Sequence, residues 1–121
     1  MITKEFLIKN KKMIKRPGLA ELSGIPLPTL HDKFDEDGPE LVPSQARAIE
    51  KGLKEGGIYK RNKISPRTIK KSPIINAKEL WRRSGFEPAI MEAINKERWH
   101  RFTEEHHKKF GSVISEMFED V

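Results

Sequence analysis

Lysine and arginine side chains are the groups of this chain whose types and spacing could do chemistry, and they suit a polyanionic partner. The formal net charge is +6, and the excess lies in two segments. Residues 1–16 are basic, and residues 59–73 contain no Asp or Glu. Such cations contact phosphates and supply much of the affinity for a nucleic acid. A role in solubility is the alternative. The basic residues of the second segment are Lys60, Arg61, Lys63, Arg67, Lys70 and Lys71.

The remaining polar residues form no pattern that is typical of an enzyme. There is no cysteine, which excludes a disulfide, a thiolate nucleophile and a thiolate metal site. The carboxylates follow no catalytic spacing, and there is no phosphate-binding loop or nucleophile elbow. His100 and His107, seven residues apart, would share a face of an unbroken helix beside His106, but no further ligand completes a metal site. We therefore expect no enzymatic activity, cofactor or metal.

The composition predicts a small, all-α protein. Hydrophobic residues make up 36% of the chain and charged residues 35%, and β-branched residues form no alternating runs. No apolar stretch reaches the length of a membrane span, so we expect a soluble, cytoplasmic protein. Trp81 and Trp99 are expected in a core or an interface rather than as platforms for stacked bases.

Residues 1–58 are predicted to form a domain of four helices that positions the first basic segment. Thr3 can cap a first helix, and Gly24 tolerates the positive φ that ends a second one. Prolines fit the first turns of the second, third and fourth helices, where a missing N–H is harmless. The expected helices run from Thr3 to about Ile14, from Pro17 to about Ser23, from Leu27 to Phe34, and from Pro43 or Ser44 to Gly56–Gly57.

Within this domain, a short pattern resembles the Cro/repressor-type helix-turn-helix family, often called XRE-like. It consists of the small residue Ala20, Gly24 at the turn, Ile25 after the turn and Leu30 in the next helix. The resemblance implies a bundle whose third helix enters the major groove of DNA, and a generic helical hairpin is the alternative. By that resemblance, the fourth helix closes the core with Ala46, Ile49 and Leu53, and the third helix presents Leu27, Pro28, Thr29, His31 and the acidic Asp32 and Asp35.

The middle segment, residues 59–73, is predicted to be an extended basic linker, because its two Ser-Pro steps disfavour helix. After it, residues 74–121 echo the first pattern at an offset of 61 positions: Leu80, Ser84, Gly85, Phe86 and Met91. Convergence on a generic helical pattern is the alternative. Asn76 and Glu79 resemble a capping box, and Thr103 is suited to begin the last helix. The second copy would expose Glu87, Ala89, Glu92, Ala93 and Lys96.

These features together predict tandem helix-turn-helix units that bind double-stranded DNA, most simply as a transcriptional regulator of phage or mobile-element type. A homodimer or a protein partner is also expected, because each unit has a thin core. The alternative is a protein-interaction or assembly adaptor with nonspecific affinity for nucleic acids, which the acidic residues of the third helix favour. The candidate DNA contacts are Lys15, Arg16, Leu27, Pro28, Thr29, His31, Lys33, Lys60, Arg61, Lys63, Arg67, Lys70, Lys71, Arg82, Arg83 and Lys96.

Overall fold

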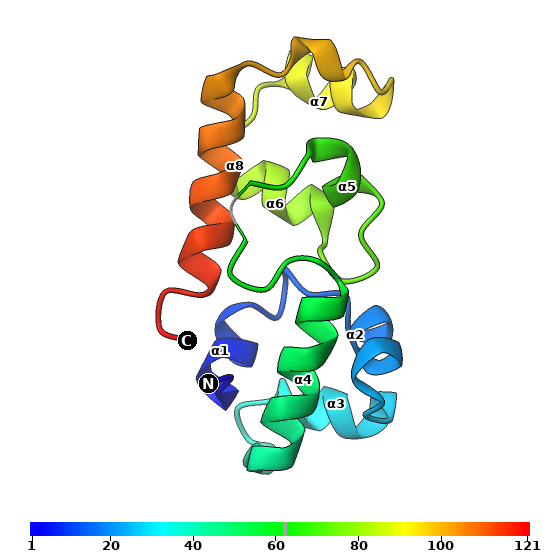
Figure 1. The fold of residues 1–121 in the computed structure, drawn as a ribbon, viewed down its shortest axis with the longest axis vertical. Coiled ribbons are helices and arrows are strands. Elements are labelled where there is room, and N and C mark those ends of the chain that lie inside the picture. Colours follow the sequence, from blue (N-terminus) through cyan, green and yellow to red (C-terminus); the bar gives the residue numbers. More distant parts are fainter. Residues whose placement is uncertain (62) are drawn as a thin grey trace.

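The computed structural model describes residues 1–61 and 63–121, and these residues fold into helices joined by short connections, with no strand (Figure 1). The all-α prediction is confirmed. No helix of the described residues is long and apolar enough to cross a membrane. The helices are α1 (Lys4–Lys9), α2 (Arg16–Ser23), α3 (Leu27–Lys33), α4 (Pro43–Glu55), α5 (Pro66–Lys70), α6 (Ala77–Arg83), α7 (Pro88–Asn95), the 3₁₀ helix η1 (Trp99–Arg101) and α8 (Glu104–Met117).

Most expected helix ends in the first half are found, but α1 is shorter than predicted. Thr3 caps α1, and Gly24 ends α2 with a φ of 77°. The helix ends at Lys9 rather than near Ile14 because Asn10 caps it, and the Asn10 side-chain amide donates to the Phe6 carbonyl at 2.9 Å. The apolar residues that follow are buried outside any helix.

The middle segment is not the extended linker that its prolines predict. Ser65 has extended dihedrals and its hydroxyl accepts a hydrogen bond from the Thr68 amide, while Pro66 begins α5. A Ser-Pro step therefore starts this helix, because proline restricts the residue before it but fits the first helical turn. Ile64 and Ile69 are buried in the same core as the flanking helices. The division of the chain into residues 1–58, 59–73 and 74–121 stays a prediction.

The helices form two sets with the same spacing. The helices α6, α7 and α8 begin 61 residues after α2, α3 and α4 respectively, and α5 follows α1 at nearly the same offset. Gly24 and Gly85, also 61 residues apart, share positive φ values of 77° and 70°. We call α1–α4 the N-terminal unit and α5–α8 the C-terminal unit. That each is a helix-turn-helix domain stays a prediction.

The two units meet through equivalent residues. Ile14 and Ile75 form an antiparallel bridge. The Lys15 amide donates to the Ile74 carbonyl, and the Asn76 amide donates to the Met13 carbonyl at 2.8 Å. Because Lys15 corresponds to Asn76 and Met13 to Ile74 at the 61-residue offset, the two bonds are reciprocal, as they are across a local twofold axis. Buried isoleucines and Met13 surround this contact and join the units in one core.

Candidate nucleic-acid interface

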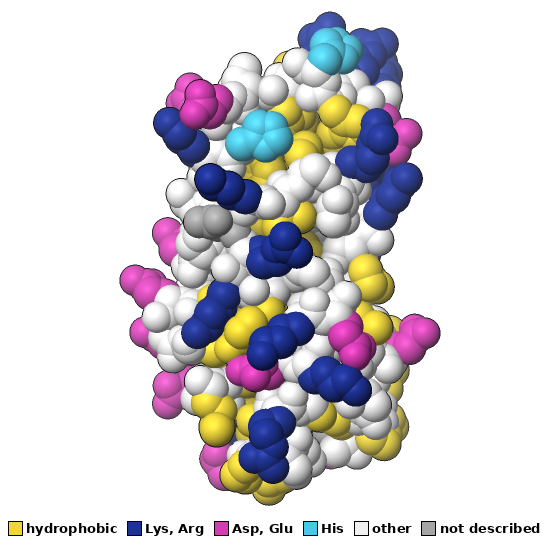
Figure 2. Space-filling view, viewed as in Figure 1, with side chains coloured by type: hydrophobic (Ala, Val, Ile, Leu, Met, Phe, Trp, Pro, Cys, Tyr) yellow, Lys and Arg dark blue, Asp and Glu magenta, His cyan; other side chains and the backbone are white. Residues whose placement is uncertain are grey.

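Lysine and arginine side chains follow one face of the molecule along its whole length (Figure 2), on the side where Figure 1 places α4, α5 and the connection between them. Acidic side chains on this view gather mainly toward the edges. The structure therefore brings the basic middle segment onto one long surface.

Five of the predicted contacts in this segment are exposed and unpaired. Among the residues that the structure describes, none of the five side chains has an ion-pair or hydrogen-bond partner. Cations without internal partners are the ones that can contact phosphates without first breaking a bond. These five residues, which we call the free basic set, are Lys60, Arg61, Lys63, Arg67 and Lys71.

Two features position the free basic set. Arg67 and Lys71 lie one helical turn apart, on α5 and at its C-terminal cap, so their side chains leave the same face. Lys60 lies over the Tyr59 ring, 5.5 Å from the centroid to Nζ. The Tyr59 hydroxyl donates to Glu50 of α4 at 2.7 Å. Burial and this bond raise the pKa of Tyr59 to about 12, so the bond persists through the neutral range and anchors the segment to α4.

Lys70 belongs to the packing rather than to the free basic set. Its ammonium donates to the Ile94 carbonyl at 3.2 Å and lies 3.7 Å from a carboxylate oxygen of Glu97. It also lies 5.8 Å from the centre of the Trp99 ring. These contacts tie α5 to the end of α7. The prediction of this residue as a phosphate contact missed that role, which a sequence pattern does not reveal.

Cations at the start of α2 are also engaged within the chain. The Arg16 guanidinium stacks 4.7 Å above the centre of the Phe34 ring and lies 3.1 Å from His31 Nδ1. The Lys15 ammonium donates to the Ser72 carbonyl at 3.1 Å. Each keeps a charge near the surface, but both help to hold neighbouring segments together. The link between Arg16 and Phe34 joins α2 to the end of α3.

The residues of α3 that were predicted to contact DNA differ in how exposed they are. Pro28 and His31 are exposed, whereas Leu27 and Thr29 are half-buried. Lys33 is only 6% exposed, and its ammonium donates to the Glu40 carbonyl at 2.7 Å. Its selection as a DNA contact is therefore wrong, because the folded chain uses the charge to hold the loop after α3. An open cavity of about 520 Å³ beside α3 is lined by acids and bases together, namely Asp32, Asp35, Glu36 and Asp37 with Lys11, Arg16 and His31.

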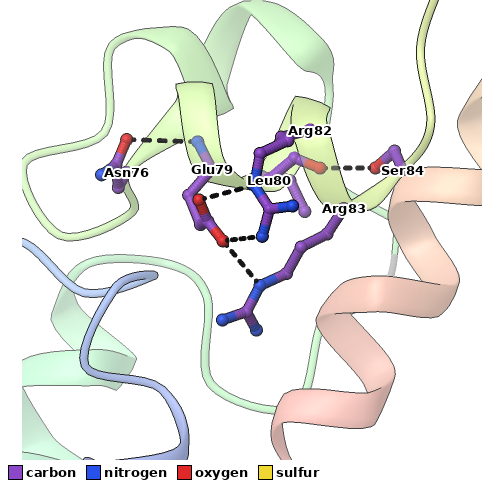
Figure 3. A network of polar contacts seen from close by, with 6 residues as sticks. All are labelled: Asn76, Glu79, Leu80, Arg82, Arg83 and Ser84. Atoms are coloured by element: carbon purple, nitrogen blue, oxygen red, sulfur yellow. Dashed lines mark hydrogen bonds and ion pairs between the residues drawn. The ribbon is translucent and has the colours of Figure 1, made fainter.

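In the C-terminal unit, Arg82 and Arg83 converge on Glu79 (Figure 3). Arg82 donates to the two carboxylate oxygens at 2.6 and 3.1 Å, and Arg83 donates at 3.0 Å. The Arg82 hydrogen bond is the largest cause that lowers the pKa of Glu79 to about 2. The expected capping box is only half formed, since Asn76 accepts from the Glu79 amide while the Glu79 carboxylate turns to the arginines. Each guanidinium has further N–H groups that do not bond to Glu79, but the Glu79 carboxylate partly neutralises the positive charge of both arginines.

The exposed face of α7 carries little free positive charge. Lys96 pairs with Glu92 at 2.6 Å, which also lowers the pKa of Glu92. Glu87 and Ala89 are exposed as predicted. Ala93 is 3% exposed, so its predicted exposure is wrong, because α7 is rotated to bury this side.

The histidines lie on different elements, contrary to the expected single helical face. His100 lies in η1, and α8 begins only at Glu104, after its cap Thr103. The Thr103 amide donates to His106 Nδ1 at 3.0 Å, so His106 caps the start of α8. In the residues that the structure describes, no three potential metal ligands gather.

Comparisons with known proteins found no match, whether among protein-family models, curated proteins or solved structures.

Proposed function

We propose that this chain is a non-enzymatic DNA-binding protein, most simply a transcriptional regulator, that holds duplex DNA through the free basic set. The observation that carries the proposal is this set of five exposed cations, close together in the chain and without acidic partners among the described residues. Duplex DNA presents closely spaced phosphates along its axis, and neutralising them releases counterions. A long basic face of this kind matches that partner better than a compact acidic protein surface.

The paired architecture supports the same proposal. A twofold-related pair of units suits DNA, because symmetric half-sites on a duplex are contacted by symmetric protein surfaces. Here the two units are joined covalently, so binding of one raises the effective concentration of the other. The helices proposed to approach the major groove are α3 and α7. Their exposed residues are few and partly acidic, so the proposed affinity comes mainly from phosphate contacts and the sequence preference is modest.

A protein-interaction adaptor is the second candidate, and one observation favours it. Four acidic residues outnumber the two cations, Lys11 and Arg16, in the lining of the open cavity beside α3, and carboxylates there repel phosphates while attracting a basic protein segment. In this alternative, α3 contacts protein and the free basic set supplies a nonspecific hold on nucleic acid. The two candidates differ in whether α3 lies against DNA.

Salt-dependent binding to a fluorescein-labelled duplex, followed by anisotropy, tests the proposal. We expect affinity to fall steeply with salt, since the slope of log K against log[salt] is about −0.9 per neutralised phosphate. The variant Arg67→Gln/Lys71→Gln should reduce the magnitude of that slope by roughly 1 to 2. Random-duplex selection then reports whether sequence is read.

The matched control is Lys108→Gln/Lys109→Gln, which removes the same charge from exposed positions on α8. The proposal requires that this control keep a slope close to that of the parent chain. If both variants reduced the slope of log K against log[salt] equally, only the net charge of the protein would matter, and the free basic set would not be a specific DNA-binding site. Absence of duplex binding at low salt would refute DNA binding altogether. Protection of α3 by a protein and not by DNA would support the adaptor.

A further inference from the structure

A cavity of about 460 Å³ lies in the C-terminal unit, between α6 and α7. Its apolar lining consists of the half-buried Met91 and of the edges of Trp81 and Ile94, which are 2% and 3% exposed, and lysines lie around it. A volume in the range of about 300–1,000 Å³ with an apolar wall and few polar groups is typical of small-molecule sites. The lysines that line it are Lys15, Lys70 and Lys78.

The two units carry different residues at the end of α3 and at the end of α7. In the N-terminal unit, Phe34 is 2% exposed at the end of α3, and the Arg16 guanidinium covers its ring. At the 61-residue offset, Phe34 corresponds to Asn95 and Arg16 to Ala77. Both counterparts line the cavity. The C-terminal unit therefore has a short amide and a methyl group where the N-terminal unit has an aromatic ring and the guanidinium that covers it.

The charges around the cavity favour an anion. Among the described residues, those that line it include no acid. Within the described residues, Lys15 bonds to the neutral carbonyl of Ser72 and has no ion-pair partner, whereas Lys70 bonds to the carbonyl of Ile94 and also pairs with Glu97. The Glu97 carboxylate lies 3.7 Å from Lys70 and its side chain is 54% exposed, so it compensates the charge of Lys70 only in part. In the part of the chain that the structure describes, Lys78 is exposed and has no ion-pair partner.

We propose that this cavity binds a small aromatic anion, with its ring against Trp81, Met91 and Ile94 and its carboxylate among the three lysines. The apolar residues can pack against a flat ring. The lysine ammonium groups have no buried carboxylate among the lining residues, so they can pair with one negative charge of the bound molecule. The bound molecule takes the place that Phe34 occupies in the N-terminal unit. It thereby fixes α7 against α6, and this binding does not depend on DNA.

Titration of the full chain with 1-naphthoate, followed by ¹H–¹⁵N NMR, tests the proposal. We expect saturable shifts of the Trp81 indole and of the amides of residues 91–95, with one molecule bound per chain. The neutral analogue 1-naphthalenemethanol should bind at least about tenfold more weakly if the charge is recognised. Lys78→Gln should weaken 1-naphthoate binding roughly threefold, as expected for one partly solvated charge pair. The control Lys108→Gln should leave it unchanged.

Filling the cavity gives an independent test. Asn95→Phe restores the ring found at Phe34 and should abolish binding of 1-naphthoate, while a well-dispersed NMR spectrum shows that the variant is folded. Unchanged binding to that variant would overturn the proposal, as would shifts confined to residues away from the cavity. Equal affinity for the neutral alcohol would refute the anionic class. Absence of saturable binding at millimolar concentrations would refute the site itself.

Discussion

The two units place the same helices at the same spacing but fill the space between them with different residues. In the N-terminal unit, α2 packs against α3 and α4, with Ala20 on α2 and Gly52 on α4. A Cβ at Gly52 would lie 3.1 Å from Leu19 Cδ1 and 3.2 Å from the Ser23 amide nitrogen. The helices thus meet at the closest distance that small residues permit. A helix pattern fixes the order of elements, whereas the size of the contact residues fixes how closely they pack.

The C-terminal unit has large residues at both positions. Trp81 corresponds to Ala20, and Val113 corresponds to Gly52. Trp81 is 2% exposed and packs 5.6 Å from the ring centre of Phe86 and 5.6 Å from that of Phe110. Phe102 completes this aromatic cluster. The indole therefore replaces close helix contact by an aromatic core, which leaves room for the cavity between α6 and α7.

Trp81→Ala should break the C-terminal unit more than any other single change in this comparison. We expect a loss of about 3–5 kcal/mol in the free energy of unfolding, because a fully buried ring is removed and its neighbours cannot fill the space. Urea unfolding followed by far-UV circular dichroism measures it. Ala20→Gly at the corresponding position should cost only about 1 kcal/mol, from helix propensity. Similar losses at both positions would contradict the difference between the two cores.

Gly52→Val tests the close contact of the N-terminal unit by introducing the residue found in the other unit. We expect a loss of about 1–3 kcal/mol, because the new methyl groups overlap with α2. The reciprocal reduction, Val113→Ala, should cost less than about 1 kcal/mol, since Val113 is only half-buried. Both are measured by the same urea titration. A stabilising effect of Gly52→Val would show that α2 and α4 can separate freely.

The sequence predicts the helix ends well where one residue determines them. Thr3, Gly24 and Thr103 act as predicted, because a cap or a positive φ depends on a single side chain. The sequence fails where the same residue types permit two outcomes. The Ser65–Pro66 step was expected to be extended, yet it begins α5, and burial of Ile69 decides between the two. Local propensity alone does not contain that tertiary contact.

The candidate site is predicted only in part for a similar reason. Composition identifies which segment is basic. Whether a lysine or arginine side chain is left without a partner depends on acids and carbonyls from other parts of the fold. Lys33 and Lys70 bond to carbonyls of Glu40 and Ile94, and nothing in their own neighbourhood indicates this. Lys60 and Arg67 remain unpaired within the described residues. The free basic set thus comes from the fold, not from the spacing of charges.

The smallest expected effect concerns a position where the units differ in charge. Glu79 corresponds to Gly18, where an added Cβ would clash with the Pro73 carbonyl. The folded-state pKa of Glu79 is about 2, below its ordinary value of 4.5. A lowered pKa contributes stability that is present above about pH 4.5 and is lost as the pH falls toward 2. Because Arg82 is 69% exposed, we expect Glu79→Gln to cost only about 1 kcal/mol at pH 7.

That cost should depend on pH in a defined direction. Urea unfolding of the parent chain and of Glu79→Gln at pH 7, 5, 4 and 3 gives the difference in unfolding free energy at each value. The difference should stay constant above about pH 5 and shrink between pH 4.5 and 2, since in that range the carboxylate of the unfolded parent chain takes up a proton while that of the folded chain, with a pKa of about 2, stays ionised until the lower end. Arg82→Gln should reproduce part of the loss. If the difference in unfolding free energy were as large at pH 3 as at pH 7, the packing of the Glu79 side chain, and not its charge, would account for its contribution to stability.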